Sequence, residues 1–167
     1  MSPPSTAHAR TYRPVAVADI TAPSLLEAMA VWRRWAAGRP APLWADVKLY
    51  ELPAVLLPMT SVMDVLDGGQ DFRCRYWGSG LTPIFGRDET GRCLSEHPIP
   101  EGREVRLGQF RDLLTSVEPK AFLLEFVTQA DIKVDKLNLR LPIVDAAGAY
   151  DKILTVCTVE FTDQRRL

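Results

Sequence analysis

The sequence contains few of the side chains on which most catalytic and metal sites are built. Only two histidines, His8 and His97, and three widely spaced cysteines, Cys74, Cys93 and Cys157, occur among 167 residues. Zinc sites usually take three or four such ligands, and a serine nucleophile usually needs a neighbouring base such as His. We therefore expect no metal site and no hydrolase triad. An odd number of scattered cysteines favours reduced, mostly buried thiols and a cytoplasmic protein.

A charge excess of either sign is also missing. Twenty basic residues against twenty-one acidic ones give a formal net charge of -1, whereas a dedicated nucleic-acid binder usually carries a clear basic excess. No run approaches the roughly 18 apolar residues that would span a bilayer, and the first residues lack the apolar core of a secretory signal. We expect neither a nucleic-acid nor a membrane partner.

The composition that is present is typical of one globular domain. Hydrophobic residues make up 47% of the chain and charged residues 25%. A chain of this length buries roughly 70% of its unfolded surface, which is enough for a core without disulfides or metals. We expect residues 1–22, rich in Pro, Ser, Thr and Ala, to be a flexible lead-in, and residues 23–163 to form the domain.

The first segment with helical periodicity, residues 24–38, predicts an amphipathic helix with two tryptophans on its apolar side. Ser24 and Glu27 have the spacing of a capping box, and Gly38 followed by Pro40 ends the pattern. The apolar positions of this helix, within residues 24–37, offer more surface than one sheet face would cover. We therefore predict a homodimer through this helix, with a candidate interface of Leu25, Ala28, Val31, Trp32 and Trp35.

The remaining pattern predicts an α+β fold built on one antiparallel sheet. Asp67-Gly68-Gly69 separates two strand-like runs, Leu56 to Leu66 and Phe72 to Trp77, and indicates a hairpin between them. A loop and short helices follow, then a longer helix within residues 102–117. Three further strands are expected in 121–128, 136–144 and 152–161. We predict five strands in the spatial order 2-1-5-4-3, numbered along the chain, with the helices forming a cap.

Two apparent catalytic motifs fail on spacing. Ser79 is flanked directly by Gly78 and Gly80, whereas a nucleophile elbow needs Gly-x-Ser-x-Gly between strand and helix. Cys93 and His97 are four residues apart, but Pro98 follows at once and no second pair of metal ligands exists. We expect Gly78, Ser79 and Gly80 to be small residues at a strand-to-helix turn, and His97 to be a loop residue.

The order of these elements resembles the PAS sensory fold, and specific residues narrow the resemblance. Over residues 24–162 the chain is similar to a small, single-domain PAS-like family of bacteria, common in alphaproteobacteria, whose function is unknown. The residues that carry the resemblance are Trp32, Trp35, Gly38-Arg39-Pro40, Asp46, Leu52-Pro53, Asp71-Phe72-Arg73, Arg75, Gly78, Phe85-Gly86-Arg87-Asp88, Thr90-Gly91-Arg92, Leu141-Pro142 and Gly148.

The resemblance implies a non-enzymatic sensory, ligand-binding or protein-interaction module that signals through a separate partner protein. It does not identify a cofactor. Gly91-Arg92-Cys93-Leu94 lacks the Asn and Phe of the flavin-adduct motif Asn-Cys-Arg-Phe. His97 precedes the longer helix on which heme-binding members place their histidine. Two alternatives stay open: a nuclear-transport-factor-like fold with an isomerase-type Asp base, and a structural dimer with a filled core.

Strand alternation suggests where a ligand would bind. It places Phe72, Cys74 and Tyr76 on one face of their strand and the residues between them, with Trp77, on the other. We predict a pocket for a small anionic metabolite, because guanidinium groups bind carboxylates and phosphates in bidentate fashion. The candidate ligand-binding residues are Arg75, Trp77, Phe85 and Arg140. An internal ion pair of Arg75 or Arg140 with Glu125 is the competing interpretation.

Overall fold

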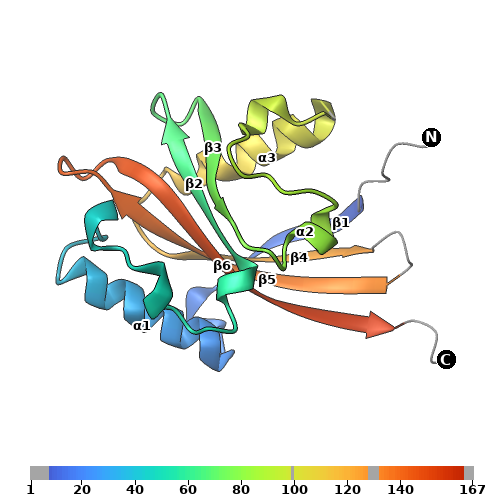
Figure 1. Ribbon diagram of the computed structural model, residues 1–167, viewed down its shortest axis with the longest axis horizontal. Helices are drawn as coiled ribbons and strands as arrows, with labels where there is room; N and C mark the ends of the chain where they lie inside the picture. The colour runs from blue at the N-terminus through green and yellow to red at the C-terminus, as the bar shows by residue number, and fades with distance from the viewer. Residues whose placement is uncertain (1–7, 99, 128–131, 164–167) are drawn as a thin grey trace.

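The computed structural model describes residues 8–98, 100–127 and 132–163 of the chain. These residues form one antiparallel sheet with helices on both of its faces (Figure 1). The strands are β1 (His8–Val15), β2 (Thr60–Leu66), β3 (Asp71–Trp77), β4 (Lys120–Val127), β5 (Ile132–Val144) and β6 (Tyr150–Asp163). The helices are α1 (Pro23–Ala36), α2 (Thr82–Phe85) and α3 (Pro100–Leu113), and single 3-10 turns occupy Val17–Asp19, Trp44–Asp46, Leu49–Glu51, Leu57–Met59 and Leu94–Glu96.

The sheet has six strands in the order β1-β4-β5-β6-β2-β3. The predicted five-stranded sheet is therefore wrong in its strand count and in its full order. The five expected strands do pair with the expected neighbours, since β2 lies between β3 and β6, and β5 lies between β6 and β4. The sixth strand, β1, is added at the β4 edge.

Strand β1 corrects the prediction of a flexible lead-in. Its backbone pairs with β4 from His8↔Val127 to Val15↔Ala121, with one register shift. Its composition is poor in the apolar alternation that marks a strand, and Pro14 is tolerated because an edge strand does not need every N–H. Residues 1–7 of the predicted lead-in lie outside the described residues.

The β2–β3 hairpin is confirmed at Asp67-Gly68-Gly69. All three residues have positive φ, of 48°, 66° and 100°, a conformation that glycine adopts without steric cost. The Gly69 N–H donates to the Leu66 carbonyl over 2.9 Å and closes the turn.

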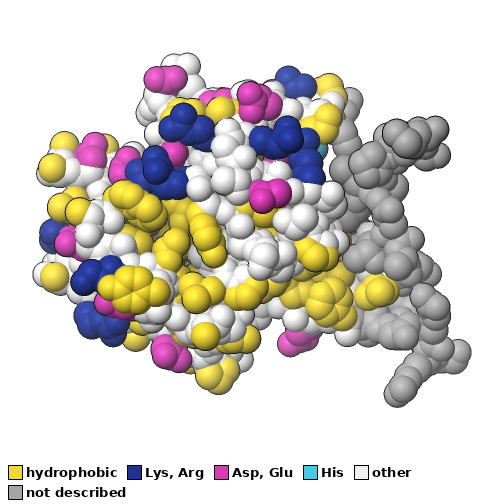
Figure 2. Space-filling model, in the orientation of Figure 1, with side chains coloured by type: hydrophobic (Ala, Val, Ile, Leu, Met, Phe, Trp, Pro, Cys, Tyr) yellow, Lys and Arg dark blue, Asp and Glu magenta, His cyan; other side chains and the backbone are white. Residues whose placement is uncertain are grey.

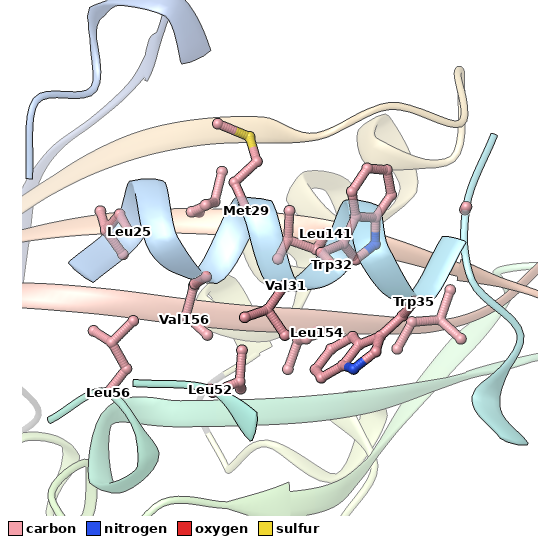
Figure 3. Packing of buried hydrophobic residues seen from close by; sticks show 14 of the residues in the cluster. Leu25, Met29, Val31, Trp32, Trp35, Leu52, Leu56, Leu141, Leu154 and Val156 are labelled. Atoms are coloured by element: carbon pink, nitrogen blue, oxygen red, sulfur yellow. The ribbon is translucent and has the colours of Figure 1, made fainter. Parts of the chain in front are cut away.

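Helix α1 covers one face of the sheet, called here the α1 face. Its apolar side packs on Leu141, Leu154 and Val156 of the central strands (Figure 3). The Trp32 indole N–H donates to the Pro142 carbonyl over 2.8 Å, and that of Trp35 donates to Glu51 over 2.8 Å. The five residues expected at a dimer interface are at most 6% exposed: Leu25, Ala28, Val31, Trp32 and Trp35.

This burial corrects the predicted interface, because these side chains complete the core of their own chain. The sheet covers these side chains together with the segment of 3-10 turns between α1 and β2. That segment adds Leu52 and Leu56 to the same cluster (Figure 3). The expected capping box is also absent: α1 begins at Pro23, and its N-cap, Ala22, offers no side-chain hydrogen bond.

Helices α2 and α3 lie over the opposite face, called here the cap face (Figure 1). Phe110 and Leu113 of α3 form a second buried cluster with Phe72, Cys74 and Ile153 of the sheet. The Phe72 and Phe110 rings lie 5.2 Å apart. The sheet is thus covered on both faces, so polar side chains on its central strands must be buried or paired.

Candidate ligand-binding site

Strand β5 places three polar side chains on the covered cap face. Lys136, Asn138 and Arg140 are 8%, 2% and 9% exposed. They alternate with Leu137, Leu139 and Leu141, which pack on the α1 side, because successive strand residues point to opposite faces. A buried central strand is usually apolar on both faces, so this polar row needs an explanation.

Arg140 ends among aromatic rings. Its guanidinium carbon lies 4.4 Å from the Phe110 ring centroid, 5.4 Å from that of Phe122 and 5.9 Å from that of Tyr12. Tyr12 and Phe122 stack on each other at 4.9 Å. Ring faces attract a cation through their quadrupole, more strongly when water is excluded. Aromatic faces here take the place of a carboxylate.

Lys136 occupies a second aromatic group nearer α2. Its ammonium nitrogen lies 4.9 Å from the Phe85 ring centroid, and the Arg106 guanidinium carbon lies 5.9 Å from the same ring. Phe85 also contacts Trp77 at 5.7 Å in an edge-to-face arrangement and stacks on Phe126 at 6.0 Å. We call Lys136, Arg140 and Arg106 the cation cluster.

Within the described part of the chain, no acidic side chain forms an ion pair with any member of the cation cluster. Buried polar atoms around it also lack hydrogen-bond partners. These atoms are Nε and Nη1 of Arg140, Oδ1 of Asn138, Oγ1 of Thr155, Nε1 of Trp77 and the hydroxyl of Tyr12. More than nine in ten buried polar groups are satisfied in proteins, so this concentration marks a candidate site.

The three charges destabilise one another. Burial lowers the pKa of Lys136, and the positive charges of Arg140 and Arg106 lower it further, while Cys157 acts in the opposite direction. Burial and the charge of Arg106 also lower the pKa of the Arg140 guanidinium, against the influence of Tyr12. Burial lowers the pKa of Arg106 as well. Each shift has the sign that an incoming anion would reverse.

The structure separates Arg75 from the other predicted site residues. Arg75 lies on the α1 side of the sheet, where its Nε donates to Asp64 over 2.7 Å and its guanidinium lies 5.9 Å from the Trp44 ring. Arg73 and Lys152 complete the network around the same carboxylate, at 3.4 Å each. Figure 2 shows basic side chains with acidic ones beside them on the face over β2 and β3. Arg75 is therefore a paired surface arginine.

Asp64 is the anchor of this network. Burial raises the pKa of its carboxyl group, but the hydrogen bond and charge of Arg75, with the charge of Lys152, outweigh burial and hold the pKa below its ordinary value. The competing pairs with Glu125 are not formed. Glu125 accepts a hydrogen bond from Thr11 and lies 3.8 Å from Lys133.

The other three predicted site residues lie on the cap face. Trp77 contacts Phe85 there, whereas Arg140 lies in the separate aromatic group around Phe110 and Phe122. Trp77 reaches the cap face because β2 and β3 shift register between Val62 and Met63. This irregularity puts Tyr76 against the α1 cluster and Trp77 against the cap cluster. The prediction from simple alternation, which grouped Tyr76 with Phe72 and Cys74, is therefore wrong.

Lys136, Arg106 and Tyr12 were not predicted from the sequence. For Lys136 a signal was present, because the repeat Lys-Leu-Asn-Leu-Arg-Leu at residues 136–141 indicates a strand with one polar face.

The rejected catalytic motifs have structural roles. Gly78 and Gly80 pass close to the Pro58 backbone, so a Cβ at Gly78 would lie 2.2 Å from the Pro58 oxygen. Ser79 between them is exposed. Among the described residues, no group of three or more His, Cys, Asp or Glu side chains could hold a metal ion.

Two open grooves, of about 390 and 330 Å³, lie beside the β2–β3 hairpin. They share Gly68 and Leu114 in their linings and include no member of the cation cluster. Within the described chain, no helix combines the length and the apolar character needed to cross a membrane.

Comparison with known proteins assigns no family. No protein-family model matches the chain, and no curated protein matches it. Among solved structures it is similar to an RNA-binding light-oxygen-voltage receptor, with 16% identity and a TM-score of 0.47 over 93% of this chain and 39% of that one. A light-oxygen-voltage domain studied with a flavin analogue gives 17% identity and a TM-score of 0.40 over 63% of this chain and 77% of that one. The chain thus spans about two fifths of the first of these proteins, and at these values neither likeness identifies a ligand.

Proposed function

We propose that this chain is a PAS-type sensory module that binds a small anionic molecule between the cap face of its sheet and helices α2 and α3. It has no catalytic activity of its own in this proposal and signals through a separate protein in the cytoplasm. Three free cysteines, two of them buried, agree with a reducing compartment. The homodimer stays a prediction, now without an assigned surface.

The observation that carries the proposal is that Arg140 is buried and that no acidic side chain in the described ranges pairs with it. A charge taken out of water is costly unless it is paired, and this guanidinium is 9% exposed with two nitrogens unpartnered. Cation–aromatic contacts recover part of that cost. A bound anion would recover the rest, which is why an interior of this kind supports ligand binding over a core evolved only for stability.

The fold supports the proposal independently of the comparisons. A hairpin, short helices, a longer helix and three antiparallel strands follow one another along the chain, and the five strands they contribute have the neighbours that the PAS resemblance implies. The isomerase-type alternative needs an Asp base in an apolar cavity. The contacts that surround the cation cluster are instead with the rings of Phe85, Phe110, Phe122 and Tyr12.

Native mass spectrometry of gently purified protein tests the proposal. We expect a co-purified small molecule in the wild type, greatly reduced in Arg140→Gln and retained in Arg75→Gln. The second variant is the matched control, because Arg75 is also a strand arginine but lies on the other face, paired with Asp64. Wild-type protein that is empty and is stabilised by no anion would favour the alternative of a filled structural core.

A further inference from the structure

We infer that the ligand is a small dicarboxylate whose two carboxylates bind at opposite ends of the β5 polar row, one at Arg140 and the other at Lys136 and Arg106. This inference rests on the proposed function and narrows it to one class of ligand. Two observations support it: the positive groups lie in two different aromatic groups, and the side-chain amide of Asn138 lies between them along β5.

The positive charges are held at two places along the strand. Residues four apart on a strand are separated by about 13 Å between Cα atoms. The Arg140 head rests on Phe110 and Phe122, whereas the Lys136 head rests on Phe85 beside Arg106. Because the heads occupy different aromatic groups, one compact anion does not satisfy both. An elongated molecule with a charge at each end does.

Asn138 sits midway between the two ends. Its side chain faces the same way as Lys136 and Arg140 and is 2% exposed. Its Oδ1 is buried without a hydrogen-bond donor, and across β6 the Thr155 hydroxyl, opposite Arg140 in register, is unpartnered too. A hydroxyl or amine group between the two carboxylates would donate to the Asn138 oxygen.

The charge balance favours a dianion over a monoanion. Lys136 and Arg140 are buried and Arg106 is partly buried. The positive charges of Arg140 and Arg106 act against that of Lys136, and within the described residues no acid forms an ion pair with any of the three. The carboxylate whose charge acts on Arg106, that of Glu89, already accepts two hydrogen bonds of 2.8 and 3.0 Å from Arg87. A single carboxylate would leave two charges unbalanced. A dicarboxylate leaves one, shared by the ring faces.

Isothermal titration of the wild type with a chain-length series from malonate to pimelate, at constant ionic strength, tests the inference. Acetate, butyrate and inorganic phosphate are the comparison probes. We expect one chain length to bind at least about tenfold more tightly than any monocarboxylate, which corresponds to one charge-assisted hydrogen-bonded contact. A hydroxylated member of the best length should bind more tightly than its parent.

The variants locate the two ends. Arg140→Gln and Lys136→Met should each lower the affinity for the best dicarboxylate about tenfold or more, and each should remove the preference over monocarboxylates. Asn138→Leu should erase only the hydroxyl preference, and Arg75→Gln should bind as the wild type does. Thermal melting of each variant verifies that it is folded, and the wild-type series does not depend on any variant.

The other possible outcomes contradict either the dicarboxylate inference alone or the proposed function as well. If phosphate or a monocarboxylate binds as tightly as every dicarboxylate, the ligand is not two-ended and the inference fails, while binding of a small anion stands. A co-purified molecule without two acidic groups has the same meaning. If no probe binds and the purified protein is empty, both the inference and the proposed function fail.

Discussion

Among single residues, Lys136 shows most directly that burying a charge on the cap face lowers the stability of the folded protein. It is 8% exposed and its ammonium group contacts a ring, and no acidic side chain among the described residues pairs with it. Lys152, one strand away, is buried to nearly the same extent, at 7% exposure. Lys152 lies 2.9 Å from Asp151 and 3.4 Å from Asp64. The two lysines therefore compare burial without an acidic partner among the described residues with burial beside two of them.

We predict that Lys136→Met stabilises the ligand-free protein. Methionine fills a similar volume without a charge to desolvate, so the free energy of unfolding should rise by about 1–2 kcal/mol. That gain raises the melting temperature by roughly 2–4 °C per kcal/mol. Lys152→Met should do the reverse, because it removes the cation that pairs with Asp151 and one of the three cations around the buried Asp64. A destabilised Lys136→Met protein would show that the lysine is already well compensated.

The same variant should change the pH dependence of stability. Folding lowers the pKa of Lys136 from its ordinary value of 10.5. Between the lowered and the ordinary pKa, the unfolded chain binds more protons than the folded one, so stability rises with pH through this window. Below it the penalty is fully present. Urea unfolding between neutral and alkaline pH should show this rise in the wild type and a smaller rise in Lys136→Met.

At the scale of elements, the sequence predicts what depends on local pattern. The hairpin at Asp67-Gly68-Gly69 and the strands beside it follow from turn chemistry and alternation, both of which are local. β1 could not be predicted in this way, because an edge strand is stabilised by pairing with β4 over a long sequence separation. The register shift in β2 and β3 is equally non-local, and it moves Trp77 to the cap face.

The glycines near the β3 end give a prediction at this scale. Gly78→Ala should destabilise the protein by about 2–3 kcal/mol, because the new methyl group would overlap the rigid Pro58 carbonyl. Gly108→Ala, inside α3 with nothing within 4 Å of the new Cβ, should instead stabilise by about 0.5–1 kcal/mol. Chemical unfolding of both variants measures the pair. Equal, small effects would mean that the β3–α2 connection can move away from Pro58.

At the scale of the whole molecule, the two faces of the sheet differ in chemistry. The α1 face is packed with apolar side chains and two satisfied tryptophans, and its buried charges, Asp64 and Lys152, are paired. The cap face combines an apolar half around Phe72 and Phe110 with a cationic half on β5. The sequence proposed Arg140, Trp77 and Phe85 as candidate site residues, and the structure places all three on the cap face. It did not identify Arg106 or Tyr12, because α3 and β1 reach the site only through the tertiary fold.

This division predicts that α1 acts as core and not as a dimer interface. Trp32→Glu should lower the free energy of unfolding by more than about 3 kcal/mol, because it buries a charge and removes a packed ring. Leu26→Glu, on the same helix at a position 44% exposed, should leave melting temperature and oligomeric state unchanged. Circular dichroism and light scattering on both variants measure these effects. A Trp32→Glu protein that melts normally but is monomeric, beside a dimeric wild type, would restore the interface on α1. If both proteins have the same oligomeric state and only Trp32→Glu unfolds early, any dimer must form through another surface.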